Sequence, residues 1–198
     1  MIRQKRLEKH LKDFLIELGL DINDPNLQDT PKRMSRMFVE EFLSNVNRKP
    51  PLDLIKSFPN DKQYDEIIML DNIPFVSLCS HHMLPFPGLA WLLYIPNKTL
   101  AGASKPARVL EFFSKKPQLQ ENLGMEVVDF FEEDIYPKGV MLVMRAVHGC
   151  MSCRGVKTGQ GSGLTTSITR GIFRDNMDTR AEGLSLIQTS VLLKGAMG

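Results

Sequence analysis

The cysteine and histidine side chains of this chain are concentrated in two short segments that are far apart in the sequence. The first segment, residues 76–82, and the second, residues 146–153, contain Cys79, His81 and His82, and His148, Cys150 and Cys153. Only His10 lies elsewhere among the three cysteines and four histidines. Thiolate and imidazole are the ligands that suit Zn²⁺. A fold that uses both segments for one ion must bring these two regions together.

The spacing within each segment predicts how the side chains divide between metal binding and proton transfer. Cys79 is expected to end a strand, with His82 in the following turn, and a C-x-x-H spacing lets both reach one ion. His148 and Cys150 are expected on a strand, where residues two apart share a face. Cys79, His82 and Cys150 would form a three-ligand site that leaves one position open to water. Such a site lowers the pKa of the bound water to about 7. His81 and His148 would then be free as acid and base groups.

Three other interpretations of these segments exist. Cysteines are often simply buried in a core, although four candidate ligands in two short segments favour a metal. Cys153 could complete a closed structural Cys₃His site with Cys79, His82 and Cys150. The C-x-x-C at residues 150–153 could be a redox pair, but it lacks a thioredoxin-like βαβ setting. The surplus histidines favour a catalytic site over a structural one.

Composition places the chain among ordinary globular proteins. It is 42% hydrophobic and 24% charged, has no apolar run of transmembrane length, and begins with a charged segment instead of a secretory leader. We therefore expect a cytoplasmic protein that binds no membrane. An odd number of cysteines argues against a disulfide framework. A net charge of +2 gives no general case for nucleic-acid binding, so an anionic ligand would need local basic groups.

The hydrophobic pattern predicts an α+β fold with a largely antiparallel sheet. An N-terminal helical arm is expected over residues 1–60 and a catalytic domain over residues 61–198. Strands are expected over residues 66–70, 75–79, 89–95, 140–147 and 164–173, with a Gly-rich turn over residues 155–163. Helices are expected over residues 3–18, from Thr30, from Pro106, from Pro117 to about Ile135, and over residues 178–193.

Two groups of polar residues are candidates for ligand binding. Ser104, Lys105 and Arg108 surround an expected helix N-terminus, which attracts anions, although an ordinary cap with solvated charges is the commoner case. Gln120 and Glu121 begin another helix. Capping alone explains Glu121, but a neighbouring Gln and Glu could also bind a guanine edge, because carboxylate accepts from N1–H and the 2-amino group.

Taken together, these residues resemble GTP cyclohydrolase I, with a similarity that runs from Asp29 to Arg180. The shared motifs are Asp29-Thr30-Pro31-x-Arg33, Cys79-x-His81-His82, Gly102-x-Ser104-Lys105-x-x-Arg108, Pro117-Gln118-x-Gln120-Glu121-x-Leu123, and Val147-His148-x-Cys150 with Arg154-Gly155. The resemblance implies a tunnelling fold, with helices on one face of an antiparallel sheet and an N-terminal helical arm. It also implies a toroidal homodecamer with active sites between subunits.

The resemblance implies a role for each candidate residue. The zinc ligands correspond to Cys79, His82 and Cys150, and the catalytic histidines to His81 and His148. The guanine anchor corresponds to Glu121 with Gln120, and the triphosphate site to Ser104, Lys105, Arg108 and Arg154, with Arg33 and Arg36 from a neighbouring subunit. The implied reaction is zinc-dependent hydrolysis of GTP by water attack at guanine C8. The imidazole ring opens, formate leaves, and rearrangement gives 7,8-dihydroneopterin triphosphate.

The chain departs from the family pattern at four positions. Ser80 replaces a usual Glu, Ser152 replaces a basic residue that is common in bacterial relatives, Cys153 is an extra thiol, and Arg170 replaces a small apolar residue. None of these is an expected ligand. The alternatives are a related tunnelling-fold enzyme acting on another pterin or purine, and a non-catalytic, zinc-stabilised oligomer that binds a nucleotide. The downstream pathway, whether folate, tetrahydrobiopterin or deazaguanine, does not follow from these residues.

Overall fold

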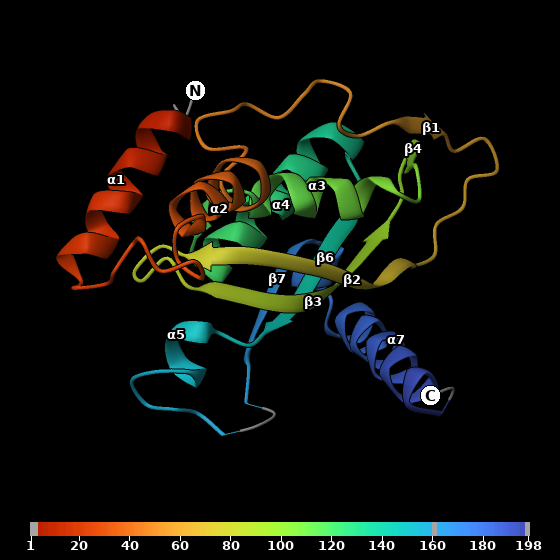
Figure 1. Ribbon diagram of the computed structural model, residues 1–198. Coiled ribbons are helices and arrows are strands. Elements are labelled where there is room, and N and C mark those ends of the chain that lie inside the picture. Colours follow the sequence, from red (N-terminus) through yellow and green to blue (C-terminus); the bar gives the residue numbers. More distant parts are fainter. Residues whose placement is uncertain (1–3, 160–161, 197–198) are drawn as a thin grey trace.

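The computed structural model of the protein describes residues 4–159 and 162–196 and confirms the α+β architecture (Figure 1). The N-terminal region contains α1 (Gln4–Glu17), α2 (Thr30–Arg36) and a short π-helix, η1 (Met37–Phe42). Gly19, with a φ of +78°, follows α1 and bends the chain toward α2. Residues 160–161 of the expected Gly-rich turn lie outside the described residues.

The central sheet has the strand order β5-β2-β3-β6-β7. These strands are β5 (Pro117–Gln118), β2 (Ile68–Cys79), β3 (Pro85–Ile95), β6 (Gly139–Ala146) and β7 (Leu164–Gly171). Neighbours are antiparallel except β5, which is parallel to β2. Separately, β1 (Ser57–Pro59) pairs with β4 (Thr99–Ala101), so the range 1–60 is not wholly helical.

Strand β2 replaces the two separate strands expected over residues 66–70 and 75–79. Its pairing with β3 shifts register between Leu70 and Ile73. Asn72, inside this bulge, has a φ of +49°, a conformation that Asn tolerates better than most residues. The Asp71-Asn72 pair, which lies between the two expected strands, therefore bends one long strand without ending it.

Helices pack against both faces of the sheet, so the expectation of helices on one face is wrong. On one face α3 (Lys105–Ser114) and α4 (Gln120–Ile135) bury an apolar cluster that includes Phe86, Leu92, Leu142 and Phe131. On the other, Trp91, Leu93 and Met141 pack with Phe173 of α6 (Ile172–Asp175) and Ile187 of α7 (Met177–Ala196). The reason is that the central strands are apolar at consecutive positions, which leaves no solvent face.

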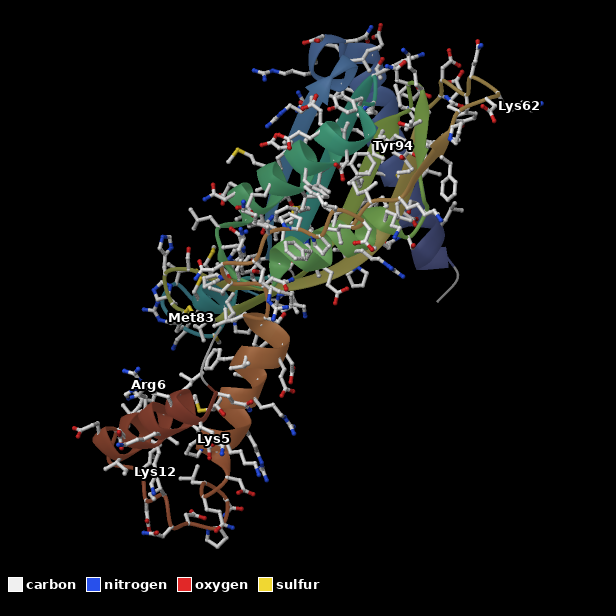
Figure 2. The ribbon with its side chains drawn as sticks, turned by 90° about the horizontal axis from the view of Figure 1, so that it is seen from above. Lys5, Arg6, Lys12, Lys62, Met83 and Tyr94 are labelled. Carbon is white, nitrogen blue, oxygen red and sulfur yellow. The ribbon has the colours of Figure 1, made fainter. Side chains whose placement is uncertain are left out.

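The direction of the strands brings the two Cys/His segments together. Strands β2 and β6 are both antiparallel to β3, so they run in the same direction and end at the same edge of the sheet. Leu78 pairs with Pro85, Gly88 pairs with Ala146, and the Val147 N–H donates to the Pro87 carbonyl at 3.0 Å. In Figure 2, Met83 marks this end of the sheet, whereas Tyr94 and Lys62 lie toward the other end.

The second segment is not a strand at its ligand positions. Strand β6 ends at Ala146, and Cys150 lies in a short helix, α5 (Gly149–Ser152). The His148 carbonyl accepts from the N–H groups of Met151 and Ser152, both at 2.9 Å. The expected shared face of His148 and Cys150 is therefore replaced by a strand-to-helix turn.

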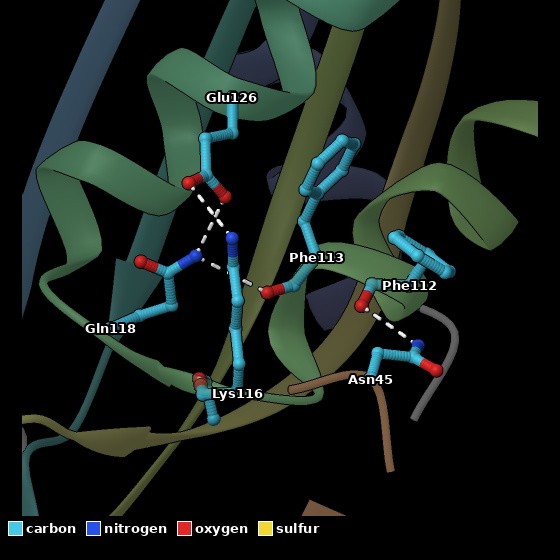
Figure 3. Close-up of polar contacts among 7 residues, drawn as sticks. Asn45, Phe112, Phe113, Lys116, Gln118 and Glu126 are labelled. Carbon is cyan, nitrogen blue, oxygen red and sulfur yellow. Dashed lines mark hydrogen bonds and ion pairs between the residues drawn. The ribbon is translucent and has the colours of Figure 1, made fainter. Parts of the chain in front are cut away.

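The short strand β5 supports the end of β2 from the other side. Gln118 pairs with Cys79, and its carbonyl accepts from the Ser80 N–H at 3.1 Å. Figure 3 shows how the buried Gln118 side chain is held, donating to Glu126 at 2.8 Å and to the Phe113 carbonyl at 3.3 Å. Lys116 pairs with the same Glu126 carboxylate at 2.9 Å. Residues 117–118 thus belong to the sheet instead of to the expected helix, which begins at Gln120.

Within the described ranges 4–159 and 162–196, no helix combines the length and the apolarity needed to cross a membrane.

The close approach of β3 to β6 leads to a first prediction, on stability. A Cβ at Gly88 would lie 2.5 Å from the Arg145 carbonyl oxygen and 2.7 Å from the Ala146 Cβ, where little can move aside. We expect Gly88→Ala to lower the free energy of unfolding by about 3 kcal/mol, as for overpacking of a core. Urea unfolding at fixed protein concentration measures this change. Gly159→Ala is the control because its Cβ would meet nothing within 4 Å, and equal unfolding of the two variants would contradict the prediction.

Candidate metal centre and active site

Three side chains from the two segments meet at the edge of the sheet. The potential ligand atoms of Cys79, His82 and Cys150 all lie within 4.8 Å of one another. Cys79 is the last residue of β2, and its carbonyl accepts from the N–H groups of His82 at 3.3 Å and Met83 at 2.8 Å. Met83 has a φ of +54°, which closes this tight turn. The turn brings His82 back over Cys79, and α5 supplies Cys150.

The donor chemistry of this cluster fits a zinc ion. Cys79 is buried, Cys150 is half-buried and His82 is exposed. Burial raises the pKa of the Cys150 thiol, and the adjacent Cys79 thiol adds to the effect. Two thiolates at this separation would repel, and a divalent cation between them removes that repulsion. Two sulfur atoms and one imidazole are a ligand set found in catalytic zinc sites.

Cys153 does not belong to this cluster among the described residues. Its side chain is exposed, and its Sγ lies 2.6 Å from the Gly149 carbonyl oxygen, to which the thiol donates. The geometry therefore favours the three-ligand arrangement over the closed Cys₃His alternative. A site with three protein ligands leaves a position for water or substrate.

The two remaining histidines differ in their surroundings. His81 is exposed, with its ring centroid 6.3 Å from that of His82. His148 is half-buried and stacks flat on Phe86, with 4.4 Å between centroids and 4° between the ring planes. Burial lowers the pKa of His148, and the negative charge of Glu121 acts in the opposite direction. The sequence does not identify Phe86 as part of the site, because the prolines on either side of it do not reveal that His148 packs against its ring.

Gln120 does not lie where the expected contact with guanine would require it. Its side chain is fully buried, and its Oε1 lies 2.9 Å from the His148 Nε2. Its Nε2 has three oxygen acceptors, which are the Met144 and Leu164 carbonyls and the Thr166 hydroxyl. The amide is thus occupied within the chain, and a substrate cannot reach it. The next residue, Glu121, is exposed in the first turn of α4.

The structure does not bring all the expected phosphate-binding residues together. Ser104 precedes α3 without a side-chain cap, and Lys105 begins that helix. Arg108 lines a cavity of about 480 Å³ between α3 and β2. Arg154 instead lies at the metal cluster, with its Nη1 2.9 Å from the His82 Nε2.

Two arginines of α2 line a different cavity from the one that Arg108 lines. Arg33 and Arg36 line a cavity of about 210 Å³ with Gln4, Asp29 and Lys32. None of these lining residues belongs to the metal cluster. Arg33 is largely exposed and forms a loose ion pair with Asp29 at 3.6 Å. The ion pair that the structure gives for Arg33 is therefore made on the arm itself and not with the cluster.

The chain is similar to known proteins of one family over nearly its whole length. Residues 7–188 match the model of the GTP cyclohydrolase I family. The GTP cyclohydrolase 1 of Streptococcus agalactiae serotype V is 40% identical over 95% of this chain and 99% of that protein. That of Carboxydothermus hydrogenoformans is 41% identical over 94% and 96%, and that of Caldanaerobacter subterraneus is 42% identical over 96% and 99%. With the similarity covering nearly the whole of each chain, this chain belongs to the GTP cyclohydrolase I family.

Proposed function

We propose that this protein is a zinc-dependent GTP cyclohydrolase that converts GTP and water to 7,8-dihydroneopterin triphosphate and formate. The observation that carries the proposal is the cluster of Cys79, His82 and Cys150. Each of the two segments that form it holds a further histidine, His81 or His148, which a purely structural site would not need. Membership of the family and the names of its relatives support the same activity. The direct test is to incubate the zinc-loaded protein with GTP, and to measure formate together with neopterin after oxidation.

The residues around the cluster divide the chemistry between them. Cys79, His82 and Cys150 would hold the zinc ion, which, when bound, supplies a Lewis acid that lowers the pKa of a coordinated water. His148 and His81 would exchange protons with the guanine ring, since imidazole can both accept and donate near neutral pH. Glu121 would accept hydrogen bonds from guanine N1–H and the 2-amino group. This contact orients C8 and N7 of the base toward the histidines.

The triphosphate would bind to the basic groups near α3 and α5. Ser104 and Lys105 lie at the N-terminal end of α3, where free N–H groups and the helix dipole favour an anion. Arg108 and Arg154 would add charge-assisted hydrogen bonds. A guanidinium only donates, so the present contact of Arg154 requires a lone pair on His82 Nε2. A metal ion on either ring nitrogen would end that contact and leave Arg154 available to phosphate.

The site would be completed between subunits of a toroidal homodecamer. Arg33 and Arg36 carry charge on the arm, where they line a cavity with Gln4, Asp29 and Lys32. Docking of the arm against the site of a neighbouring subunit would place these arginines on the triphosphate. This arrangement accounts for two cations that are otherwise solvated.

The second prediction concerns metal binding. We expect Cys150→Ala to lose both zinc and activity, because it removes one of three ligands, whereas Cys153→Ala should keep both. Metal content after gel filtration and GTP turnover are the two measurements. Retention of zinc by Cys150→Ala, or its loss from Cys153→Ala, would show that the ligand set is wrong.

The third prediction concerns the triphosphate. We expect Arg108→Ala or Lys105→Ala to weaken GTP binding by about 2 kcal/mol, the size of a charge-assisted contact, which corresponds to roughly a 30-fold rise in Kd. Titration calorimetry with GTP measures the change. Lys62→Ala, at the opposite end of the sheet (Figure 2), is the matched control for loss of a positive charge. Turnover of guanosine at the same rate as GTP would contradict the presence of an anion site.

The fourth prediction concerns assembly. Cys150→Ala and Arg33→Ala should each be inactive as pure oligomers, because one lacks the metal set and the other lacks the arm cation. When the two are refolded together, some mixed sites combine an intact metal set with an intact arm, so partial activity should return. A fully active monomer in gel filtration would contradict the shared site, as would full activity of Arg33→Ala alone.

A further inference from the structure

We propose that Gln120 is a positioning residue that fixes both the ring orientation and the tautomer of His148, an inference that rests on the proposed function of His148 in proton transfer. The side chain of Gln120 is fully buried at the start of α4. It lies between the backbone of β6 and β7 on one side and the imidazole on the other. The tautomer of His148 depends on which end of the Gln120 amide faces the ring.

The amide of Gln120 can adopt only one of its two orientations. Its Nε2 lies 3.2 Å from both the Met144 and the Leu164 carbonyl oxygens. Carbonyl oxygens only accept hydrogen bonds, so the amide end that faces them must be the NH₂ group. A flipped amide would bring its own oxygen against two carbonyl oxygens in a buried space, which costs the desolvation of each. The third contact, to the Thr166 hydroxyl at 3.0 Å, suits the same orientation.

This orientation determines where His148 carries its proton. The Gln120 Oε1 faces the His148 Nε2 at 2.9 Å and can only accept. Nε2 must therefore be the protonated nitrogen of the neutral ring. Nδ1 then holds the lone pair, and it is the nitrogen left for proton exchange. The backbone carbonyls of β6 and β7 thus select the tautomer of His148 through one intervening amide.

Phe86 restrains the ring in the remaining direction. Because the two rings are parallel within 4° and 4.4 Å apart between centroids, tilting the imidazole would push it into Phe86. Rotation within the plane of the ring would break the hydrogen bond to Gln120. The two contacts together hold the imidazole in one orientation before any substrate binds.

An ordinary buried glutamine would explain the same hydrogen bonds as satisfaction of a polar core group. The two roles differ in what happens to His148 when the Gln120 oxygen is removed. A packing role predicts an unchanged tautomer and a general loss of stability. A positioning role predicts a mixture of tautomers even where the protein stays folded and keeps its zinc.

The test uses full-length, zinc-loaded protein labelled with ¹⁵N-histidine and solid-state NMR of the imidazole nitrogens. Spectra are taken at mildly alkaline pH, where free imidazole is neutral, and His148 is assigned by comparison with His148→Asn. The wild type should give a protonated Nε2 and a bare Nδ1. Gln120→Met, which is close in shape but has no acceptor oxygen, should give both tautomers. Gln120→Leu also lacks the acceptor oxygen and should likewise give both tautomers.

Thr166→Val is the matched control, because it removes one partner of the Gln120 amide but leaves both carbonyl partners in place. Its tautomer should be that of the wild type. A single, unchanged tautomer in Gln120→Met or Gln120→Leu would overturn the proposal, and so would a bare Nε2 in the wild type. Because both variants lack the acceptor oxygen, poor folding of Gln120→Met still leaves a decisive result from Gln120→Leu.

Turnover provides a second readout that separates this proposal from the proposed function. Gln120→Met should lower kcat about 10- to 100-fold, the usual effect of losing a hydrogen bond that orients a functional imidazole, with little change in KM. A glutamine that contacts the substrate would instead change KM. If the wild type did not turn over GTP, the proposed function would fail, while the tautomer measurement would still decide the role of Gln120.

Discussion

The site depends above all on the pairing of β3 between β2 and β6. Because both partners are antiparallel to β3, their carboxyl ends meet at one edge, and residues far apart in the sequence become neighbours. Register matters as much as order, since a shift of one residue would turn every side chain to the other face of the sheet. The contact of Gly88 with β6 admits no side chain, which helps to hold that register. The cluster of Cys79, His82 and Cys150 and the contacts of His148 all follow from this one arrangement.

Local sequence signals predicted the parts of the site that depend on short spacing. The C-x-x-H turn at Cys79 and His82 and the choice of Cys150 as third ligand agree with the cluster in the structure. The predicted strand at Cys150 was wrong, because a β-branched run ending at Val147 does not reveal that the next residues form a helix. The packing of helices against the second face of the sheet was also not predicted. Consecutive apolar residues in β3 and β6 are compatible with a buried strand, but they do not say which helix covers it.

Gln120 and Glu121 illustrate a limit of motif-based assignment. Sequence reasoning grouped them because they are adjacent and both suit a purine edge. Adjacent residues on a helix point about 100° apart, however, so one can enter the core while the other faces solvent. In this chain Gln120 is fully buried and Glu121 is exposed. The proposed guanine contact of Glu121 and the proposed positioning of His148 by Gln120 therefore share one helical turn, so a displacement of the start of α4 would disturb both.

The packing on the second face of the sheet has an optical consequence. The chain has one tryptophan, Trp91, which is 7% exposed in the cluster that joins β3 and β6 to α6 and α7. Its indole N–H has no hydrogen-bond partner within the part of the chain that the structure describes, so its surroundings there are apolar. Tryptophan emission from this chain therefore originates from one known position. A shift of that emission to longer wavelength would report detachment of the C-terminal helices, without any introduced label and independently of the metal cluster.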